Sequence, residues 1–196
     1  IKVGQQHGID FMLDMVLNHC SIEHEWFQKA LDGDSYYQDF FILRDEPTDW
    51  LSKFGGSAWA PFGDTGKYYL HLYDVTQADL NWRNPNVRQE LFKVVNFWRD
   101  KGVKGFRFDV INVTGKDEVL TDCPEQEGKP AYTDKPIVHD YLRMMNEATF
   151  GQDDSFMTVG EMSATTIENC ILYTAPDRQE LSMAFNFHHL KVDYEA

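Results

Sequence analysis

Two acidic residues stand where buried strands are expected to end. Asp109 closes the segment KGFRFD at 104–109, and Glu161 follows the apolar segment FMTVG at 156–160. Retaining glycoside hydrolysis needs two carboxyl groups about 5–5.5 Å apart, one as nucleophile and one as acid/base. Neighbouring strands lie about 4.8 Å apart, so acids at the ends of adjacent parallel strands suit that chemistry.

Arg107 is expected to lie next to Asp109, the candidate nucleophile. Because Arg107 and Asp109 are two residues apart, their side chains point to the same side of a strand. The guanidinium would keep Asp109 ionised, as a nucleophile requires. A structural ion pair at a strand end explains these two residues equally well. The apolar approach to Glu161 favours a protonated general acid, although a solvent-facing glutamate at the start of a loop is commoner.

A third polar group follows the apolar segment IDFMLDMV at 9–16, in the order Asp14, Asn18 and His19. His19 has three interpretations: a hydrogen-bond partner for a sugar hydroxyl, a metal ligand, or a buried structural histidine. The structural interpretation is the commonest for a single histidine. Asp14 lies inside the predicted strand, which favours a structural hydrogen-bonding role.

The elements that must position these residues alternate along the chain. Apolar segments predict strands at 9–16, 104–111, 155–159 and 181–187, each buried on both faces. Helical spacing predicts helices at 85–101, 137–149 and 165–174, the first with Asn84 as N-cap, Pro85 at its start and Gly102 at its end. This order is the βα repeat of a parallel sheet, either wound flat or closed as a barrel.

One connection is too long for a simple loop. More than sixty residues rich in Trp, Tyr, Gly and Asp separate the first predicted strand from the helix at Pro85. We expect a small inserted subdomain with a few short strands. The predicted division is 1–19 and 83–196 for the main α/β domain and 20–82 for the inserted subdomain. The polar segment 112–135 is expected to be a surface loop.

Composition excludes several classes of protein. Eighteen basic and 32 acidic residues give a net charge of −14, which argues against binding to nucleic acid or an anionic membrane. Cys20, Cys123 and Cys170 are widely spaced and odd in number, so neither a disulfide framework nor a zinc site is expected. A cytoplasmic location is the expectation. The chain begins at Ile1, without a Met, and is expected to be a fragment of a longer protein.

Four motifs resemble those of the α-amylase superfamily, glycoside hydrolase family 13, and occur in that family's order. They are Asp14-x-x-x-Asn18-His19, Gln77-Ala-Asp-Leu-Asn81-Trp82, Gly105-Phe-Arg107-Phe-Asp109 and Val159-Gly-Glu161-Met162. The resemblance covers the whole chain. It implies part of a TIM (β/α)8 barrel, roughly strands three to six, with a small α+β subdomain inserted after the third strand.

The resemblance also implies roles for single residues. Asp109 would be the nucleophile, Glu161 the acid/base, and Arg107 and His19 contacts to the glucosyl residue. The family's third carboxylate lies near its seventh strand, outside this chain, so the fragment alone is expected to be inactive. No cofactor is expected, because a family calcium loop, where present, also lies outside. A part-barrel with open sheet edges is expected to self-associate.

Finer features point to a substrate. FGGSAW at 54–59, YYLHLY at 68–73 and Val110 resemble the oligo-1,6-glucosidase and dextran glucosidase group, whereas GEMSATT at 160–166 and the segment 180–194 resemble trehalose-6-phosphate hydrolases. His188 and Lys191 could meet a sugar phosphate, with Lys191 as a point charge; Lys191 could equally be a solvated surface residue. Trehalose 6-phosphate is the expected substrate. The alternatives are isomaltose-type α-1,6 bonds, and a catalytically silent binding or interaction protein.

Overall fold

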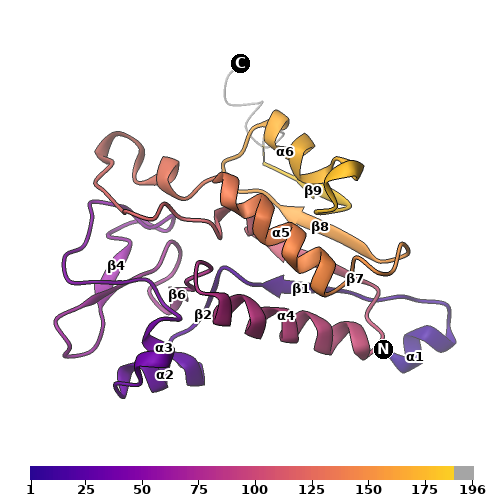
Figure 1. Ribbon diagram of the computed structural model, residues 1–196, viewed down its shortest axis with the longest axis horizontal. Helices are drawn as coiled ribbons and strands as arrows, with labels where there is room; N and C mark the ends of the chain where they lie inside the picture. The colour runs from indigo at the N-terminus through magenta and orange to yellow at the C-terminus, as the bar shows by residue number, and fades with distance from the viewer. Residues whose placement is uncertain (188–196) are drawn as a thin grey trace. The chain divides into compact units, whose positions relative to one another are not determined.

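The computed structural model describes residues 1–187, which divide into two compact units. The first unit comprises residues 1–16, 89–115 and 133–187, and the second comprises 17–88 and 116–132. The order of the elements along the chain can be followed in Figure 1. Among the described residues, no helix is both long and apolar enough to cross a membrane.

The first unit is built on a four-stranded sheet. Its order is β1-β7-β8-β9, and all three strand pairs are parallel. The strands are β1 (Met12–Val16), β7 (Gly105–Asp109), β8 (Met157–Glu161) and β9 (Met183–Phe185). The four predicted strands are therefore confirmed as a parallel sheet, with ends that differ by up to three residues.

Helices connect these strands. They are α4 (Pro85–Asp100), α5 (Pro136–Ala148) and α6 (Ile167–Thr174), whereas α1 (Lys2–Gln6) precedes β1. Short 3-10 turns occur at η1 (Ile111–Val113) and η4 (Pro176–Arg178). The predicted start of α4 is confirmed, because Asn84 Oδ1 accepts a hydrogen bond from the Asn86 N–H at 2.9 Å. Gly102, with φ +92°, follows the end of α4.

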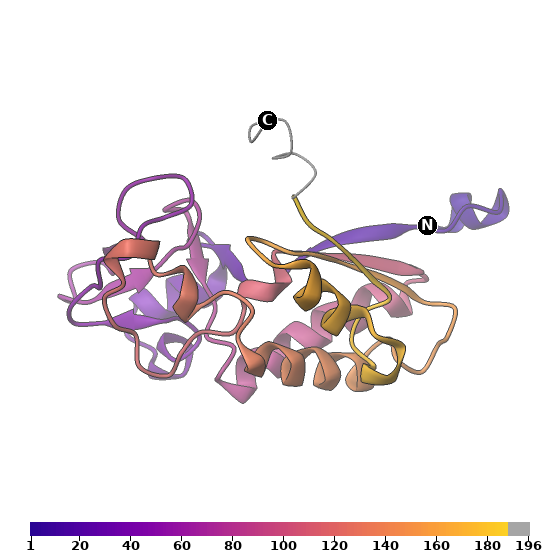
Figure 2. The same ribbon diagram turned by 90° about the horizontal axis from the view of Figure 1, so that it is seen from above.

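The prediction that each strand is buried on both faces is wrong for this chain, because the two faces of the sheet differ. Helices α4 and α5 lie along one face (Figure 2), toward which the buried Met15, Phe106 and Phe108 point. The alternate residues of the strands point to the opposite face, which we call the open face. Residues of the open face include the half-exposed Val16 and Met157. Every charged residue of β1, β7 and β8 lies on the open face, because side chains alternate along a strand.

The second unit contains two small sheets. One pairs β2 (His19–Ser21) with β6 (Gln77–Asp79), and the other has the order β3 (Leu43–Arg44), β5 (Tyr68–Leu70), β4 (Trp59–Pro61), with every pair antiparallel. The helices α2 (Glu25–Leu31) and α3 (Ser35–Gln38) begin at capping side chains of His24 and Asp34. Phe27 of α2 packs edge-on against Phe41, Phe62 and Tyr69 to form an aromatic core.

The segment 112–135 is a surface loop only in part, since most of residues 118–127 are exposed. Residues 112–116 are buried, and residues 116–132 belong to the second compact unit, where they form the turns η2 (Pro124–Gln126) and η3 (Lys129–Ala131). The indole of the fully buried Trp50 donates a hydrogen bond to the Thr121 carbonyl at 2.9 Å. Polarity alone could not reveal this burial, because partners far along the chain satisfy the polar groups.

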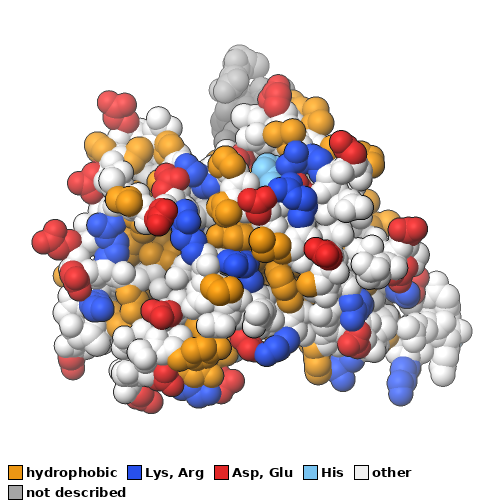
Figure 3. Space-filling view, viewed as in Figure 1, with side chains coloured by type: hydrophobic (Ala, Val, Ile, Leu, Met, Phe, Trp, Pro, Cys, Tyr) orange, Lys and Arg blue, Asp and Glu red, His pale blue; other side chains and the backbone are white. Residues whose placement is uncertain are grey.

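Charge on the surface is mixed in sign. On the face drawn in Figure 3, acidic and basic side chains are interspersed, and no continuous basic stripe crosses that face. The chain has a net charge of −14, and this face carries no basic patch of the kind that nucleic-acid binding requires.

Gly128 offers a test of packing in the second unit. It has φ +84°, and a methyl group on its Cα would overlap the ring of Trp50. We expect Gly128→Ala to lower the free energy of unfolding by about 3 kcal/mol, from backbone strain and overpacking together. Gly33→Ala is the matched control, since Gly33 has φ +95° with open space around it, and should cost only about 1 kcal/mol. Urea unfolding measures both, and equal losses would contradict the packing argument.

Candidate functional site

Strands β7 and β8 bring the two predicted acids to one edge of the sheet. Asp109 is the last residue of β7, and Glu161 is the last residue of β8. Because Phe108 is in register with Gly160, the two acids end neighbouring strands on the open face. Glu161 is 9% exposed, whereas Asp109 is partly exposed. Carboxyl ends of barrel strands are where enzymes of this architecture place reacting groups.

Arg107 joins these acids. Its Nη1 lies 2.8 Å from Asp109 Oδ1 and 2.6 Å from Asp14 Oδ1, and its Nη2 contacts Glu161 Oε2. Asp14 reaches the guanidinium from β1, where it is in register with Arg107. The Arg107 guanidinium therefore contacts three carboxylates, which come from three adjacent strands. Burial alone would lower the pKa of Arg107, but the hydrogen bonds and charges of Asp14 and then Asp109 raise it, so the guanidinium remains charged.

The backbone turns sharply after Asp109. Val110 has φ 38° and ψ 40°, a left-handed conformation that is rare for a β-branched residue. The turn leads into η1, where the buried Asn112 accepts a hydrogen bond from the Ser163 N–H at 2.8 Å and donates to the Ser163 carbonyl at 2.8 Å. Asn112 also donates to Asp134 Oδ1 at 2.9 Å. These bonds tie the loop after β7 to the loop after β8.

His19, which with Arg107 was predicted to contact the glucosyl residue, belongs to the second unit. It is 6% exposed and lies opposite Asp79 in the β2–β6 ladder. Its ring is centred 5.3 Å from the ring of Tyr73. Its Nδ1 lies 3.3 Å from Asn18 Nδ2, and its Nε2 lies 3.2 Å from Gln77 Nε2.

A buried polar cluster lies beside His19, which we call the Asp79 cluster and define as Asn18, Asp79 and Lys116. Lys116 Nζ lies 2.8 Å from Asp79 Oδ2 and donates to Asn18 Oδ1 at 2.8 Å. Asn18 Nδ2 donates to Asp79 Oδ2 at 2.9 Å. Asp79 is fully buried and Lys116 is 4% exposed. Burial lowers the pKa of Lys116, and the charge of Asp79 opposes that shift.

Sequence reasoning gave Asp79 and Lys116 no role. Asp79 stood inside a motif that carried the family resemblance, and this was the one available signal. Lys116 lay in a segment predicted to be on the surface. The predicted phosphate contacts His188 and Lys191 lie outside the described residues. Within residues 1–187, no group of three His, Cys, Asp or Glu side chains is arranged to hold a metal ion.

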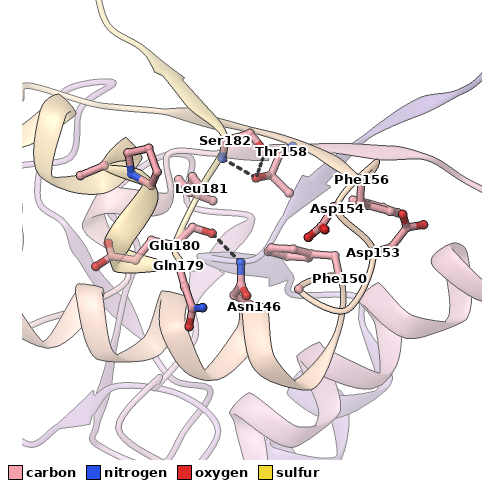
Figure 4. A pocket seen from close by; sticks show the side chains of 13 residues that line it. Asn146, Phe150, Asp153, Asp154, Phe156, Thr158, Gln179, Glu180, Leu181 and Ser182 are labelled. Carbon is pink, nitrogen blue, oxygen red and sulfur yellow. Dashed lines mark hydrogen bonds between the residues drawn. The ribbon is translucent and has the colours of Figure 1, made fainter.

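Figure 4 shows a pocket in the first unit, and neither Asp109 nor Glu161 is among the residues that line it. It is lined by Phe156 and Thr158 at the start of β8 and by Ser182 just before β9, whereas Glu161 is at the other end of β8. Thr158 Oγ1 accepts a hydrogen bond from the Ser182 N–H at 2.9 Å, and Asn146 Nδ2 donates to the Glu180 carbonyl at 3.1 Å. These bonds brace the amino-terminal ends of the strands, where barrel residues serve stability.

Removing the shared cation should expose repulsion among its three partners. We expect Arg107→Met to destabilise the protein at low salt and to regain about 1 kcal/mol as added salt screens the carboxylates at neutral pH. The unchanged protein should not gain stability in this way, because salt screens its ion pairs. Thermal unfolding across a salt series measures the difference. Arg99→Met is the control, since the Arg99 side chain pairs with the single carboxylate of Asp100 at 2.9 Å. A salt response shared by both variants would refute the expectation.

Comparison with known proteins agrees with these motifs. The family described as "Alpha amylase, catalytic domain" matches residues 1–196. The chain is 51% identical over 201 residues to a trehalose-6-phosphate hydrolase of Bacillus subtilis and 44% identical over 200 residues to an oligo-1,6-glucosidase of Parageobacillus thermoglucosidasius. These alignments cover 99% and 96% of this chain, but 36% and 35% of the relatives.

Solved structures agree as well. The crystal structure of Bacillus licheniformis trehalose-6-phosphate hydrolase superposes with a TM-score of 0.94 at 52% identity, over 98% of this chain and 36% of that one. The chain thus spans about a third of the length of these relatives, and its parallel sheet with connecting helices is part of their barrel. On the family match, the ordered motifs and this superposition, the chain belongs to the α-amylase family of glycoside hydrolases.

Proposed function

We propose that the protein containing this chain is a retaining α-glucosidase that hydrolyses trehalose 6-phosphate to glucose and glucose 6-phosphate. The observation that carries the proposal is the sharing of Arg107 by Asp109 and Glu161 at the ends of adjacent strands. That arrangement places two carboxyl groups on neighbouring strands beside one cation, and double displacement requires such a pair as nucleophile and acid/base.

The proposed reaction has two steps. Asp109 attacks the anomeric carbon of the glucosyl residue, and the glycosidic C–O bond breaks as Glu161 gives its proton to the leaving oxygen. Glu161 then takes a proton from water, the water oxygen bonds to the anomeric carbon, and Asp109 is released. Contact with Arg107 favours an ionised Glu161, so acid catalysis requires Glu161 to turn from the guanidinium to the leaving oxygen.

The proposed substrate rests on the relatives and on two residues. The relative named trehalose-6-phosphate hydrolase is 51% identical, against 44% for the one named oligo-1,6-glucosidase. His188 and Lys191 are proposed to contact the phosphate of the leaving sugar, where a cation would offset the net charge of −14. Cleavage of isomaltose-type bonds is the second candidate, supported by that second group of relatives.

The test uses the full-length protein that contains this chain, with trehalose 6-phosphate and isomaltose measured side by side. We expect higher kcat/KM for the phosphorylated disaccharide. Asp109→Asn should lower kcat by about 10⁴-fold, because the nucleophile is lost. A mechanism-based fluorosugar should label Asp109 covalently, and absence of label would favour a catalytically silent protein.

The phosphate contact is tested in the same assay. We expect Lys191→Ala to raise KM for trehalose 6-phosphate about tenfold while leaving isomaltose unaffected, as loss of one charge-assisted contact predicts. Lys101→Ala is the matched control, because Lys101 is an exposed lysine just after α4 that has no part in the proposed site. An unchanged KM for the phosphorylated substrate in Lys191→Ala would remove the contact from the proposal.

We also propose that the 196-residue chain self-associates. Among the described residues no strand pairs with the outer edges of β1 and β9, and the β9 side chain of Met183 is 41% exposed. Unpaired edges with apolar side chains favour pairing between chains. Light scattering should show oligomers that Met183→Lys weakens and that Val3→Lys, on the exposed helix α1, does not. A monomer at every concentration would refute this.

A further inference from the structure

Asp134, just before helix α5, is the centre of a polar cluster that lies wholly within the first unit. We call it the Asp134 cluster and define it as Asn112, Asp134, Thr165, Asn169 and Tyr173. Its other four side chains donate hydrogen bonds to the carboxylate: Asn112 Nδ2 at 2.9 Å and Tyr173 Oη at 3.0 Å to Oδ1, and Thr165 Oγ1 at 2.7 Å and Asn169 Nδ2 at 2.9 Å to Oδ2. The Asp134 N–H also donates to the Asn112 carbonyl at 3.0 Å.

The direction of these hydrogen bonds follows from the chemistry of the groups. A carboxylate only accepts, so the amide atoms of Asn112 and Asn169 that face it must be the nitrogens. The orientation of Asn112 is fixed independently, because its Oδ1 accepts a hydrogen bond from the Ser163 N–H at 2.8 Å. Burial raises the pKa of Tyr173, and the charge and hydrogen bond of Asp134 raise it further. The phenol therefore keeps its proton and donates to Asp134.

The cluster joins the two segments that follow the proposed reacting acids. Asn112 comes three residues after Asp109, and Thr165 comes four residues after Glu161. Both donors are buried, so water competes little for their hydrogen bonds. The other two donors lie in helix α6, which follows the second of these segments. One carboxylate thus connects the end of β7, the end of β8 and a helix.

The two acids lie beyond the end of the strand pairing between β7 and β8. The register between these strands ends at Phe108 and Gly160, one residue before each acid. Beyond the acids, the Asn112 side chain bonds both backbone groups of Ser163. The acids are therefore flanked by a strand ladder on one side and by a side-chain bridge on the other, and Asp134 holds the Asn112 side of that bridge.

The backbone of both segments adopts conformations that need outside support. Val110, Asp134 and Ala164 have φ of 38°, 50° and 51°. Residues other than glycine rarely take up such left-handed conformations, and they persist where surrounding contacts impose them. Ala164 is exposed, so packing of its side chain does not impose its conformation. Instead the residues on its two sides are hydrogen-bonded to Asn112 and to Asp134.

We propose that Asp134 is a positioning residue, which holds the segments after β7 and β8 so that Asp109 and Glu161 keep the separation that the reaction needs. The proposal rests on the proposed function. Retaining hydrolysis requires the two carboxyl groups about 5–5.5 Å apart, and displacement of a reacting group by about 1 Å costs on the order of 10²-fold in rate. In this role Asp134 touches no reacting atom and acts through Asn112 and Thr165.

Asp134→Asn in the full-length protein is the direct test. Asparagine has the same shape and tolerates positive φ, but its NH₂ group would face two of the four donors. We expect kcat for the disaccharide that the unchanged protein cleaves to fall about 10²-fold, with KM changed less than about twofold, because alignment in the transition state is lost and ground-state binding is kept. In the folded variant, an unchanged kcat or a change confined to KM would overturn the proposal.

Tyr173→Phe tests the route of the effect. It removes the hydroxyl donor and keeps the buried ring, which stacks on His139 with the ring centroids 4.5 Å apart. We expect kcat to fall about fivefold, and to fall no further when Asp134→Asn is added to an already lowered background, beyond the loss in Asp134→Asn alone. Losses that multiply in the double variant would overturn the proposal. If Asp134→Asn does not fold, Tyr173→Phe decides alone, and an unchanged kcat would overturn it.

The matched control is Glu127→Gln. Glu127 is an exposed acidic residue with φ 56°, so this variant makes the same change of charge at the same kind of backbone conformation. Its side chain pairs with Lys129 in the second unit. Both kcat and KM should remain those of the unchanged protein. A fall in kcat equal to that of Asp134→Asn would mean that the loss of any such carboxylate lowers the rate, and would overturn the proposal.

Hydrogen exchange of the Ser163 amide separates this inference from the proposed function, because it needs no substrate. The Ser163 N–H is bonded to Asn112, so its exchange should be about tenfold or more faster in Asp134→Asn than in the unchanged protein. Equal exchange rates would overturn the inference in an active or an inactive protein. A protein that cleaves no α-glucoside contradicts the function alone, whereas an active protein whose Asp134→Asn variant keeps its kcat contradicts the inference alone.

Discussion

The open face of the sheet depends on one guanidinium. Asp14, Asp109 and Glu161 come from three neighbouring strands and would repel one another if they were left alone on that face. Arg107 can serve all three because its nitrogens form a planar fork, with Nη1 toward two carboxylates and Nη2 toward the third. A lysine would offer a single point of charge. The strand register that aligns Asp14 with Arg107 is therefore an electrostatic requirement as well as a packing one.

The second unit uses a cation differently. The Lys116 ammonium is buried, and its partners are the Asp79 carboxylate and the Asn18 amide oxygen. A buried ion pair adds little net stability, since desolvation offsets much of the attraction. Its effect is on orientation, because it leaves Asn18 one arrangement only. The charged side chains thus have different effects in the two units: Arg107 binds three carboxylates in the first, and Lys116 fixes the direction of hydrogen bonds in the second.

Local sequence patterns predicted the first unit well. Apolar segments marked all four strands, and Asn84-Pro85 marked the start of α4, because apolar patterning and helix capping act over a few residues. The second unit was predicted only as a small α+β insertion. Its buried cluster joins Asn18 and Lys116 across 98 positions of sequence, and no local pattern reports such a contact. The family motifs identified the acids, but they gave no sign that Arg107 would also bind Asp14.

Alternation along β7 has a consequence for how such a chain can evolve. A single inserted or deleted residue in that strand would send Arg107 and Asp109 toward the helices and bring Phe106 and Phe108 to the open face. No compensating substitution nearby could repair both faces at once. The connections between strands can change in length without this effect, and the second unit is built from two of them, residues 17–88 between β1 and β7 and residues 116–132 between β7 and β8.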